Sequence, residues 1–415
     1  MQILNQRRTT GALLLTALCT APIAAQDVLV QASKIVVAFG AGETKSTTLA
    51  DSALLIRNGK IAFVGADIPP EARRGARVVD YGTATISPGF VLAATTLGRD
   101  VDLGEGAIAF TPDLRTAEAF DPWLEQLEQL APAGVTAFGL TPSARNVAGG
   151  IGAVGKPGKD RVRLLAAEVF VGFSVSRTAR NQERQPTSLM GAHQMLRESF
   201  TEARDGIKIG PDLAVLRQVM SGQRPAFFYA DTFAELNAVL EIGASFNFAP
   251  IILGGSESDR VLQKLATRGA GVVLNTLNPS MRLVELELPA KLTKAGIAFC
   301  FAGRPDQLRL SAALAVRHGL DRSTANAALT RTPATMLGQQ ANIGALRSGC
   351  GADFVVFEGD LLDLGARHVA TWIDGKLAHG TLAHSTLAHS TLAHSKLAHR
   401  TGPNSKPQTN ISGGR

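Results

Sequence analysis

The pattern of apolar and polar positions predicts strands at both ends of the chain. Residues 28–87 carry short apolar runs broken by turn residues, and two of these runs flank Asn58-Gly59. Asn-Gly between two such runs is a strong hairpin signal. A similar pattern returns at 352–357 and at 369–379, where Asp374-Gly375 takes the turn position. The sequence therefore predicts terminal strands that pair with each other.

The pattern changes after Ser87-Pro88-Gly89, a turn that leads into the short apolar run starting at Phe90. From there, segments with helical spacing alternate with short apolar segments rich in β-branched and aromatic residues. Helices are predicted at 121–130, 188–203, 212–220, 233–242, 260–267, 288–295, 323–330 and 333–337, and strands at 134–140, 225–229, 249–253, 271–274 and 297–301. This alternation, over about 250 residues, predicts a parallel sheet with crossover helices.

We therefore expect an α/β protein. Residues 88–340 are expected to form a (β/α)8 TIM-like barrel, and residues 26–87 plus 341–380 a small composite β-sandwich domain. The length of 415 residues suits one large barrel or two domains.

Residues 1–25 have the features of a secretory signal peptide. Arg7 and Arg8 form a basic start, residues 11–18 are apolar, and Ile23-Ala24-Ala25 offers small residues before Gln26. The apolar run is too short to span a bilayer comfortably. A lipoprotein box at Cys19 and a twin-arginine signal are weaker alternatives. The sequence predicts export, most simply to a bacterial periplasm, with no membrane span after signal removal.

The cysteines and the charge exclude two simple interpretations. Cys19 leaves with the signal, while Cys300 lies in a predicted strand and Cys350 in a glycine-flanked loop, so two free thiols are predicted, with a disulfide as the alternative. Of the net charge of +7, the signal carries +2 and the segment after Gly380 carries +4. The body is therefore nearly neutral and gives no support for nucleic acid as a partner.

Residues 381–415 form a repetitive tail that we expect to be disordered. The unit Lys376–Gly380 recurs four times, and the five copies hold five of the eight histidines. A spacing of five residues does not gather these side chains on one face of a helix or a strand. The simplest interpretation is a duplication of the last strand, and weak metal binding by the tail is the alternative.

The glycine-rich segment Gly150–Pro157 matches two phosphate-binding patterns but lacks their context. No predicted strand leads into it, Pro157-Gly158 follows where a helix should begin, and the Ser or Thr of a P-loop is missing. We interpret it as a barrel loop.

Few side chains with acid–base chemistry are placed where a barrel enzyme needs them. The body has three histidines, His193, His318 and His368, and none follows a predicted barrel strand. Asp231 and Asp306 each follow a strand, and Arg304 lies beside the second. These three are weak pocket candidates, and capping of the next helix explains the two aspartates equally well.

The order of short motifs from 28 to 378 resembles exported, imidazolonepropionase-like members of the amidohydrolase superfamily. The matching segments are Asn58–Ile61 with Val64-Gly65, Pro88–Val91, Gly134–Thr136, Leu337-Gly338, Ile343–Leu346, Ala352–Val356 and Asp374–Lys376.

The resemblance implies zinc or another divalent metal held by His-x-His on the first barrel strand, sometimes a carboxylated Lys, two further His and an Asp. The matching positions hold Ala94 and Thr96, Phe170, Tyr229 and Leu253, and Gly303 or the adjoining Arg304. None of these residues is a competent replacement ligand for zinc, and Tyr229, which could ligate a metal, would stand nearly alone, so we expect no metal or other cofactor.

Two functions stay open at this point. The first is a catalytically degenerate homologue acting as a binding or partner subunit, with an active amidohydrolase homologue or a small-molecule or peptide ligand as its partner. The alternative is a hydrolase of carbon–nitrogen bonds that uses atypical metal ligands, metal-free chemistry or residues of a partner.

Overall fold

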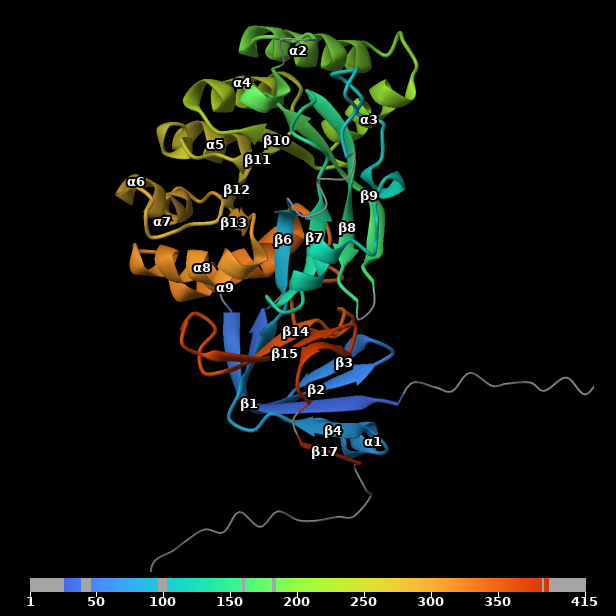
Figure 1. Ribbon diagram of the computed structural model, residues 1–415, viewed down its shortest axis with the longest axis vertical. Coiled ribbons are helices and arrows are strands. Elements are labelled where there is room, and N and C mark those ends of the chain that lie inside the picture. Colours follow the sequence, from blue (N-terminus) through green and yellow to red (C-terminus); the bar gives the residue numbers. More distant parts are fainter. Residues whose placement is uncertain are drawn as a thin grey trace, which may run out of the picture.

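The computed structural model describes residues 26–38, 46–95, 103–158, 161–180, 184–382 and 384–387. Two sheets follow one another along the long axis of the molecule (Figure 1). One contains the strands from both chain ends, and the other contains the central strands. No helix in the described ranges is long and apolar enough to cross a membrane.

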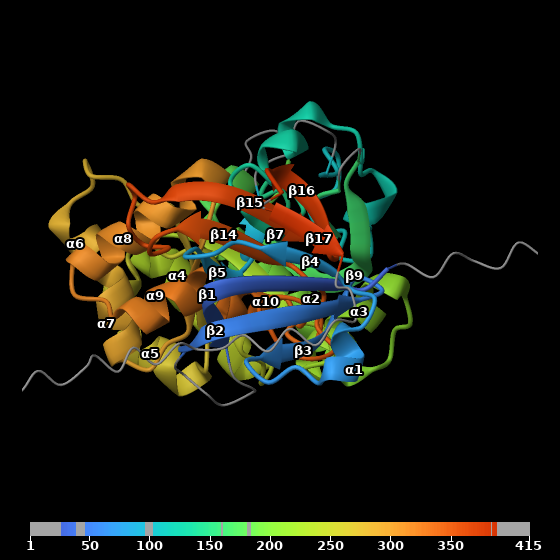
Figure 2. The ribbon, with the colours of Figure 1, turned by 90° about the horizontal axis from the view of Figure 1, so that it is seen from below.

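The terminal strands form one mixed, nine-stranded sheet, as predicted. Its main path is β16-β15-β14-β5-β1-β2-β3, and β14 pairs with β5 through Val356 and Ile86. Its strands are β1 (Val28–Ala38), β2 (Ser46–Arg57), β3 (Lys60–Gly65), β4 (Arg77–Asp80), β5 (Thr85–Pro88), β14 (Phe354–Glu358), β15 (Arg367–Ile373), β16 (Lys376–Gly380) and β17 (His384–Leu387), with the short helix α1 (Pro70–Arg73) before β4. Seen from below, this sheet covers the base of the other one (Figure 2).

Both predicted two-residue hairpins are present. Asn58 and Gly59 have φ angles of 50° and 75°, and Asp374 and Gly375 have φ angles of 48° and 69°. Positive φ at both turn positions matches the right-handed twist of the flanking strands, and Asn, Asp and Gly adopt it at the lowest cost.

The structure corrects one part of the tail prediction. Residues 384–387, expected to be disordered, form β17 and pair antiparallel with β4, which otherwise pairs with β1. The repeat keeps the sequence of a strand, so a copy of it can pair with an open strand edge. The rest of the tail, residues 388–415, and the predicted signal, residues 1–25, lie outside the described residues.

The central strands form an eight-stranded sheet in chain order that curls until β13 lies beside β6. The (β/α)8-type fold class is therefore confirmed. The strands are β6 (Phe90–Thr95), β7 (Val135–Leu140), β8 (Ala148–Lys156), β9 (Arg163–Ser174), β10 (Ala226–Ala230), β11 (Pro250–Gly254), β12 (Gly271–Asn275) and β13 (Phe299–Ala302).

Helices line one side of this barrel (Figure 1). They are α2 (Leu189–Asp205), α3 (Pro211–Met220), α4 (Phe233–Ser245), α5 (Leu262–Arg268), α6 (Leu283–Leu286), α7 (Leu288–Lys294), α8 (Leu308–Arg317), α9 (Arg322–Leu329) and α10 (Arg331–Met336). The predicted helices from 188 onward are confirmed, and α6 and α8 are additions. Helix α2 shows why spacing identified them: Ala192, Leu196 and Phe200 recur every four residues and are buried.

The other side of the barrel departs from the regular pattern. Strand β8 runs antiparallel to both β7 and β9. The helix predicted at 121–130 is wrong: only a 3₁₀ segment forms there, at Glu125–Gln129. The Asp121 carboxylate accepts a hydrogen bond from the Trp123 N–H at 2.9 Å, and residues 122–123 form a turn.

Strand β8 also replaces the predicted glycine-rich loop. A Cβ atom on Gly152 would lie 2.2 Å from the Phe170 ring, and one on Gly155 would lie 2.6 Å from the Phe138 ring. These glycines therefore allow aromatic side chains to cross a buried strand, and packing explains the phosphate-like spacing.

The barrel interior is apolar and closely packed. The rings of Phe170 and Phe227 lie with centroids 4.5 Å apart.

The two cysteines of the described chain are both buried. Cys300 Sγ lies 3.5 Å from Met336 Sδ, and Cys350 lies beside the Ala341 carbonyl. Both thiols are free, as predicted, and burial raises the pKa of each.

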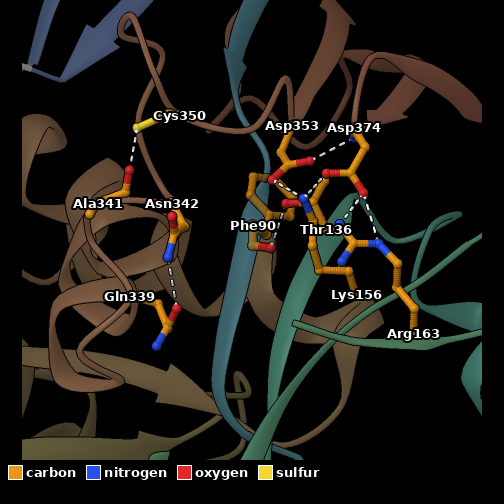
Figure 3. Close-up of polar contacts among 10 residues, drawn as sticks. All are labelled: Phe90, Thr136, Lys156, Arg163, Gln339, Ala341, Asn342, Cys350, Asp353 and Asp374. Atoms are coloured by element: carbon orange, nitrogen blue, oxygen red, sulfur yellow. Dashed lines mark hydrogen bonds and ion pairs between the residues drawn. The ribbon is translucent and has the colours of Figure 1, made fainter. Parts of the chain in front are cut away.

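A buried ionic cluster joins the base of the barrel to the composite sheet (Figure 3). Lys156, at the carboxyl end of β8, is 1% exposed, and its Nζ lies 2.7 Å from Asp353 Oδ2. The same ammonium group pairs with Asp374, which also pairs with Arg163. The Asp374 N–H donates to Asp353 Oδ1 at 2.9 Å. Two cations and two anions thus balance at this junction.

Candidate functional site

A cavity of about 240 Å³ lies at the carboxyl ends of the barrel strands. Barrel enzymes place their chemistry at this end because several strands converge there. The polar side chains of its lining are Ser176, Thr178, Tyr229, Asp231 and Asn275, and its small or apolar residues are Ala94, Ala144, Leu253, Gly254, Val273, Ala302 and Gly303. Of the lining residues that the structure describes, Asp231 is the one with a formal charge.

The structure brings together four of the positions that match metal ligands by the resemblance. Ala94, Tyr229, Leu253 and Gly303, from four different strands or strand ends, all line the cavity. Thr96 lies outside the described residues. Phe170 does not line the cavity, and its fully buried ring packs on Phe227 inside the barrel. The matched positions therefore lie around one cavity. Their side chains are the methyl group of Ala94, the phenol of Tyr229 and the isobutyl group of Leu253, and Gly303 has none.

Tyr229 uses its hydroxyl within the cavity wall. The Oη atom lies 3.2 Å from Thr141 Oγ1 and 3.2 Å from the Pro142 carbonyl oxygen. These contacts tie the end of β10 to the loop after β7.

Asp231 follows β10 directly and does not cap a helix. The N-cap of α4 is Thr232, whose hydroxyl accepts from the Glu235 N–H, while Glu235 accepts in return from the N–H groups of Thr232 and Asp231. The capping interpretation is thus wrong for Asp231, because the box uses the next residue. Its carboxylate accepts a long hydrogen bond, 3.5 Å from the Ser256 N–H, and Ser256 also acts on it through its side chain.

Burial raises the pKa of Asp231, and the nearby negative charge of Glu235 adds to this, while hydrogen bonds from Ser256 oppose it. The carboxylate lies against Gly254, where an added Cβ would be 2.4 Å from Asp231 Oδ1. Glycine at the end of β11 therefore leaves room for the carboxylate at the cavity wall.

The other two pocket candidates pair with each other. Arg304 Nη2 lies 2.8 Å from Asp306 Oδ2, and both side chains are largely exposed. Neither lines the cavity. Asp306 sits in a 3₁₀ turn before α8 and does not cap that helix, so the capping interpretation is also wrong there.

Sequence reasoning missed three polar residues of the cavity. Asn275 ends β12, and Ser176 and Thr178 follow β9 within four residues. Asp231 was singled out because it follows a predicted apolar strand. The same criterion identifies Asn275, which is the first polar residue after the apolar run 271–274. Ser176 and Thr178 follow a strand that only the structure defines.

The three body histidines lie elsewhere. His193 is on α2, His318 ends α8, and His368 on β15 stacks on Phe357 with its Nδ1 3.0 Å from the Pro132 carbonyl oxygen. Burial lowers the pKa of His193 and of His368. In the ranges that the structure describes, no three His, Cys, Asp or Glu side chains gather closely enough to hold a metal ion.

Comparisons with known proteins agree with the observed fold. The match to a family model does not include the residues of the cavity. Residues 306–379 match the family model described as the amidohydrolase family. A 66-residue segment, 16% of the chain, is 41% identical to amidohydrolase tasK of Hapsidospora irregularis and spans 7% of that protein. The matched range 306–379 runs from the end of the barrel into the composite sheet and contains no residue of the cavity lining.

Solved structures extend the likeness over most of the chain. An amidohydrolase from Thermotoga maritima MSB8 matches 85% of this chain and 100% of its own, with a TM-score of 0.73 and 23% identity. Phenylurea hydrolase B matches 85% of this chain and 96% of its own, with a TM-score of 0.52 and 16% identity. At these identities the likeness concerns the fold.

Proposed function

Because the chain is an amidohydrolase-superfamily protein, we propose that it is a catalytically degenerate homologue whose barrel mouth binds a small molecule without a catalytic metal. One observation carries the proposal. Ala94, Tyr229, Leu253 and Gly303, which match family ligand positions, line a single cavity and together supply one oxygen donor.

The residues of the cavity do not fit a metal of the family's kind. Zinc in proteins takes four ligands from thiolate, imidazole and carboxylate groups. The described lining offers the Asp231 carboxylate and the Tyr229 hydroxyl, and the latter already contacts Thr141 and Pro142. The position matching the family's lysine holds Phe170, which packs on Phe227. We therefore derive no metal-dependent step for this chain.

The cavity retains features that suit binding. It lies at the end of the barrel where several strands converge, and it combines apolar walls with a few polar groups. In this proposal the chain acts through its ligand or through an active amidohydrolase homologue that performs the chemistry. Co-purification of such a homologue with the chain, identified by mass spectrometry, tests the partner role.

Metal content of the full-length protein tests the central claim. The matched variant replaces His384, His389, His394 and His399 by glutamine, so that metal held by the tail is removed without deleting β17. We expect zinc well below one atom per chain in this variant after expression with added zinc. Stoichiometric zinc that survives these substitutions overturns the proposal.

A hydrolase is the second candidate, and Asp231 is the observation that favours it. A partly buried carboxylate with a raised pKa at a barrel mouth suits a general base. Assays of purified protein on aryl amides and aryl esters test this function. Turnover that disappears in Asp231→Asn and persists in Asp306→Asn supports the hydrolase, and no turnover in the wild type supports the binding role.

We also propose that the chain is exported, on the basis of residues 1–25. Amino-terminal sequencing of the protein from a periplasmic fraction tests this, with Gln26 as the expected first residue. A protein that keeps Met1 in the cytoplasm contradicts it.

A further inference from the structure

We propose that the cavity at the barrel mouth takes a small organic cation, an amine or a guanidine, whose charged group pairs with Asp231. This inference rests on the proposed function, because a metal ion in the cavity would itself neutralise the carboxylate. It adds the chemical class of the ligand and the residue that selects it.

The charge balance of the cavity is the first step. Asp231 carries the one formal charge among the described residues of the lining. Among the residues that the structure describes, no Lys, Arg or His forms an ion pair with it, and the charged group that acts on it is Glu235, of the same sign. Arg180, on the preceding loop, is already paired with Glu235. Within the described residues the carboxylate thus has no counter-charge, and a bound cation would supply one.

The position of Asp231 is the second step. Its N–H donates to Glu235 Oε2 at 3.0 Å, and its carbonyl oxygen accepts from the Glu257 N–H at 3.0 Å. These bonds fix its backbone from both sides, and Gly254 leaves the space that the side chain fills. The carboxylate is therefore held in place before a ligand arrives, which lowers the entropy lost on binding.

The other residues of the lining indicate which kind of uncharged group the rest of the ligand has. Leu253, Val273 and Ala302 offer apolar contact, while Ser176, Thr178 and Asn275 offer neutral hydrogen-bonding groups. At about 240 Å³ the cavity lies below the usual range of drug-sized sites, about 300–1,000 Å³. A compact apolar body with one positive group fits this lining.

An inorganic cation fits it less well. Ca²⁺ takes about six to eight oxygen ligands and Mg²⁺ about six, usually with more than one carboxylate or a phosphate. An ammonium or guanidinium group needs one carboxylate and tolerates apolar walls around the rest of the molecule. The lining of one carboxylate among neutral groups thus favours the organic cation.

Leaving a partly buried carboxylate unpaired costs free energy of folding. A cation that pairs with the carboxylate removes this cost in the bound state. The free energy that the unpaired carboxylate costs the ligand-free protein therefore contributes to the affinity. Burial also raises the pKa of Asp231, in keeping with this environment.

Titration calorimetry with three matched probes tests the inference on the full-length protein. Benzylammonium, benzyl alcohol and benzoate have similar size and differ in charge. We expect benzylammonium to bind about tenfold or more tightly than benzyl alcohol, a difference of about 1.4 kcal/mol. Benzoate is expected to bind most weakly.

Two variants locate the effect. Asp231→Asn keeps the shape of the side chain and removes its charge, so it is expected to abolish the preference for benzylammonium. Asp306→Asn, an exposed carboxylate outside the cavity, is expected to retain it. Circular dichroism and the melting temperature confirm that both variants fold.

Several results overturn the inference. They are equal binding of the three probes, a preference that survives in Asp231→Asn, tighter binding of benzoate, or no binding by benzylammonium and a series of primary amines from methylammonium to phenethylammonium. Stoichiometric zinc in the tail variant overturns the proposed function instead. A metal-free protein without preference for cations overturns only the ligand class.

Discussion

The carboxylates at the two ends of the barrel differ in the charges that surround them. At the base, Asp353 and Asp374 surround Lys156, and Arg163 completes a neutral cluster (Figure 3). At the mouth, Asp231 has a like-charged neighbour and, within the described residues, no cationic partner. The cluster at the base links two parts of the fold, whereas the single charge at the mouth is available to a ligand.

The direction of β8 underlies this difference. A parallel strand in its place would end at the mouth and would carry Lys156 to that end of the barrel. The antiparallel strand carries it to the base, where the composite sheet supplies Asp353 and Asp374. The reversed strand therefore places this cation at the base and not at the mouth.

Removing the cation at the base is expected to have the largest effect. Lys156→Met leaves two neighbouring carboxylates buried without their ammonium partner, and breaking a buried pair in this way costs about 3–5 kcal/mol. Urea denaturation measures the loss in the free energy of unfolding. The control Arg57→Met breaks an exposed pair with Asp27 and is expected to change little. An equal effect of both variants would show that the junction does not depend on the buried charge.

A smaller loss is expected from the barrel wall between the two ends. Gly152→Ala forces a methyl group to within 2.2 Å of the Phe170 ring, so the ring or β8 must shift. Overpacking of this kind costs about 1–3 kcal/mol. Gly106→Ala is the matched control, since an added Cβ there meets nothing within 4 Å. Thermal unfolding compares the two, and indistinguishable melting temperatures contradict the packing argument.

The affinity of the mouth for benzylammonium is expected to depend on pH. The raised pKa of Asp231 means that the carboxylate becomes protonated at a higher pH than usual, and the neutral form cannot pair with a cation. Affinity should therefore be constant above that pKa and fall below it, toward the affinity for the neutral benzyl alcohol. Glu235, paired with Arg180, and the neutral Ser256 also face this carboxylate. Calorimetry over a pH series checks the profile, and an affinity that rises on acidification rules it out.

The smallest expected effect is a gain in stability. A raised folded-state pKa means that the Asp231 carboxylate is disfavoured in the folded protein, so its charge lowers stability above its unfolded pKa. Asp231→Asn removes this charge and is expected to raise the melting temperature at pH 7 by about 1–2 °C. The gain should vanish on acidification below the unfolded pKa, near 3.9.

Asp306→Asn, which loses an ion pair with Arg304, is expected to show no such gain. Equal shifts in the two variants would remove the distinction between the mouth and the exposed surface.

The sequence by itself determined the features that arise from neighbouring residues. The hairpin turns at Asn58-Gly59 and Asp374-Gly375, the spacing of buried residues in α2 and the alternation of strands and helices after residue 188 all depend on local backbone preferences and periodicity. The resemblance supplied the positions of the family's metal ligands, and the sequence then showed which residues occupy them: Ala94, Phe170, Tyr229 and Leu253.

Only the tertiary structure decided what depends on distant partners. The glycine-rich segment is a strand because it pairs with β7 and β9, where its glycines leave room for the rings of Phe138 and Phe170, and β17 pairs with the edge of β4. Lys156 and Asp374 are 218 residues apart in the chain, yet each neutralises the other, while Arg304 and Asp306 neutralise each other away from the cavity. Charge balance is a sum over spatial neighbours, so the fold, and not the sequence pattern, determines that Asp231 has no cationic partner among the described residues.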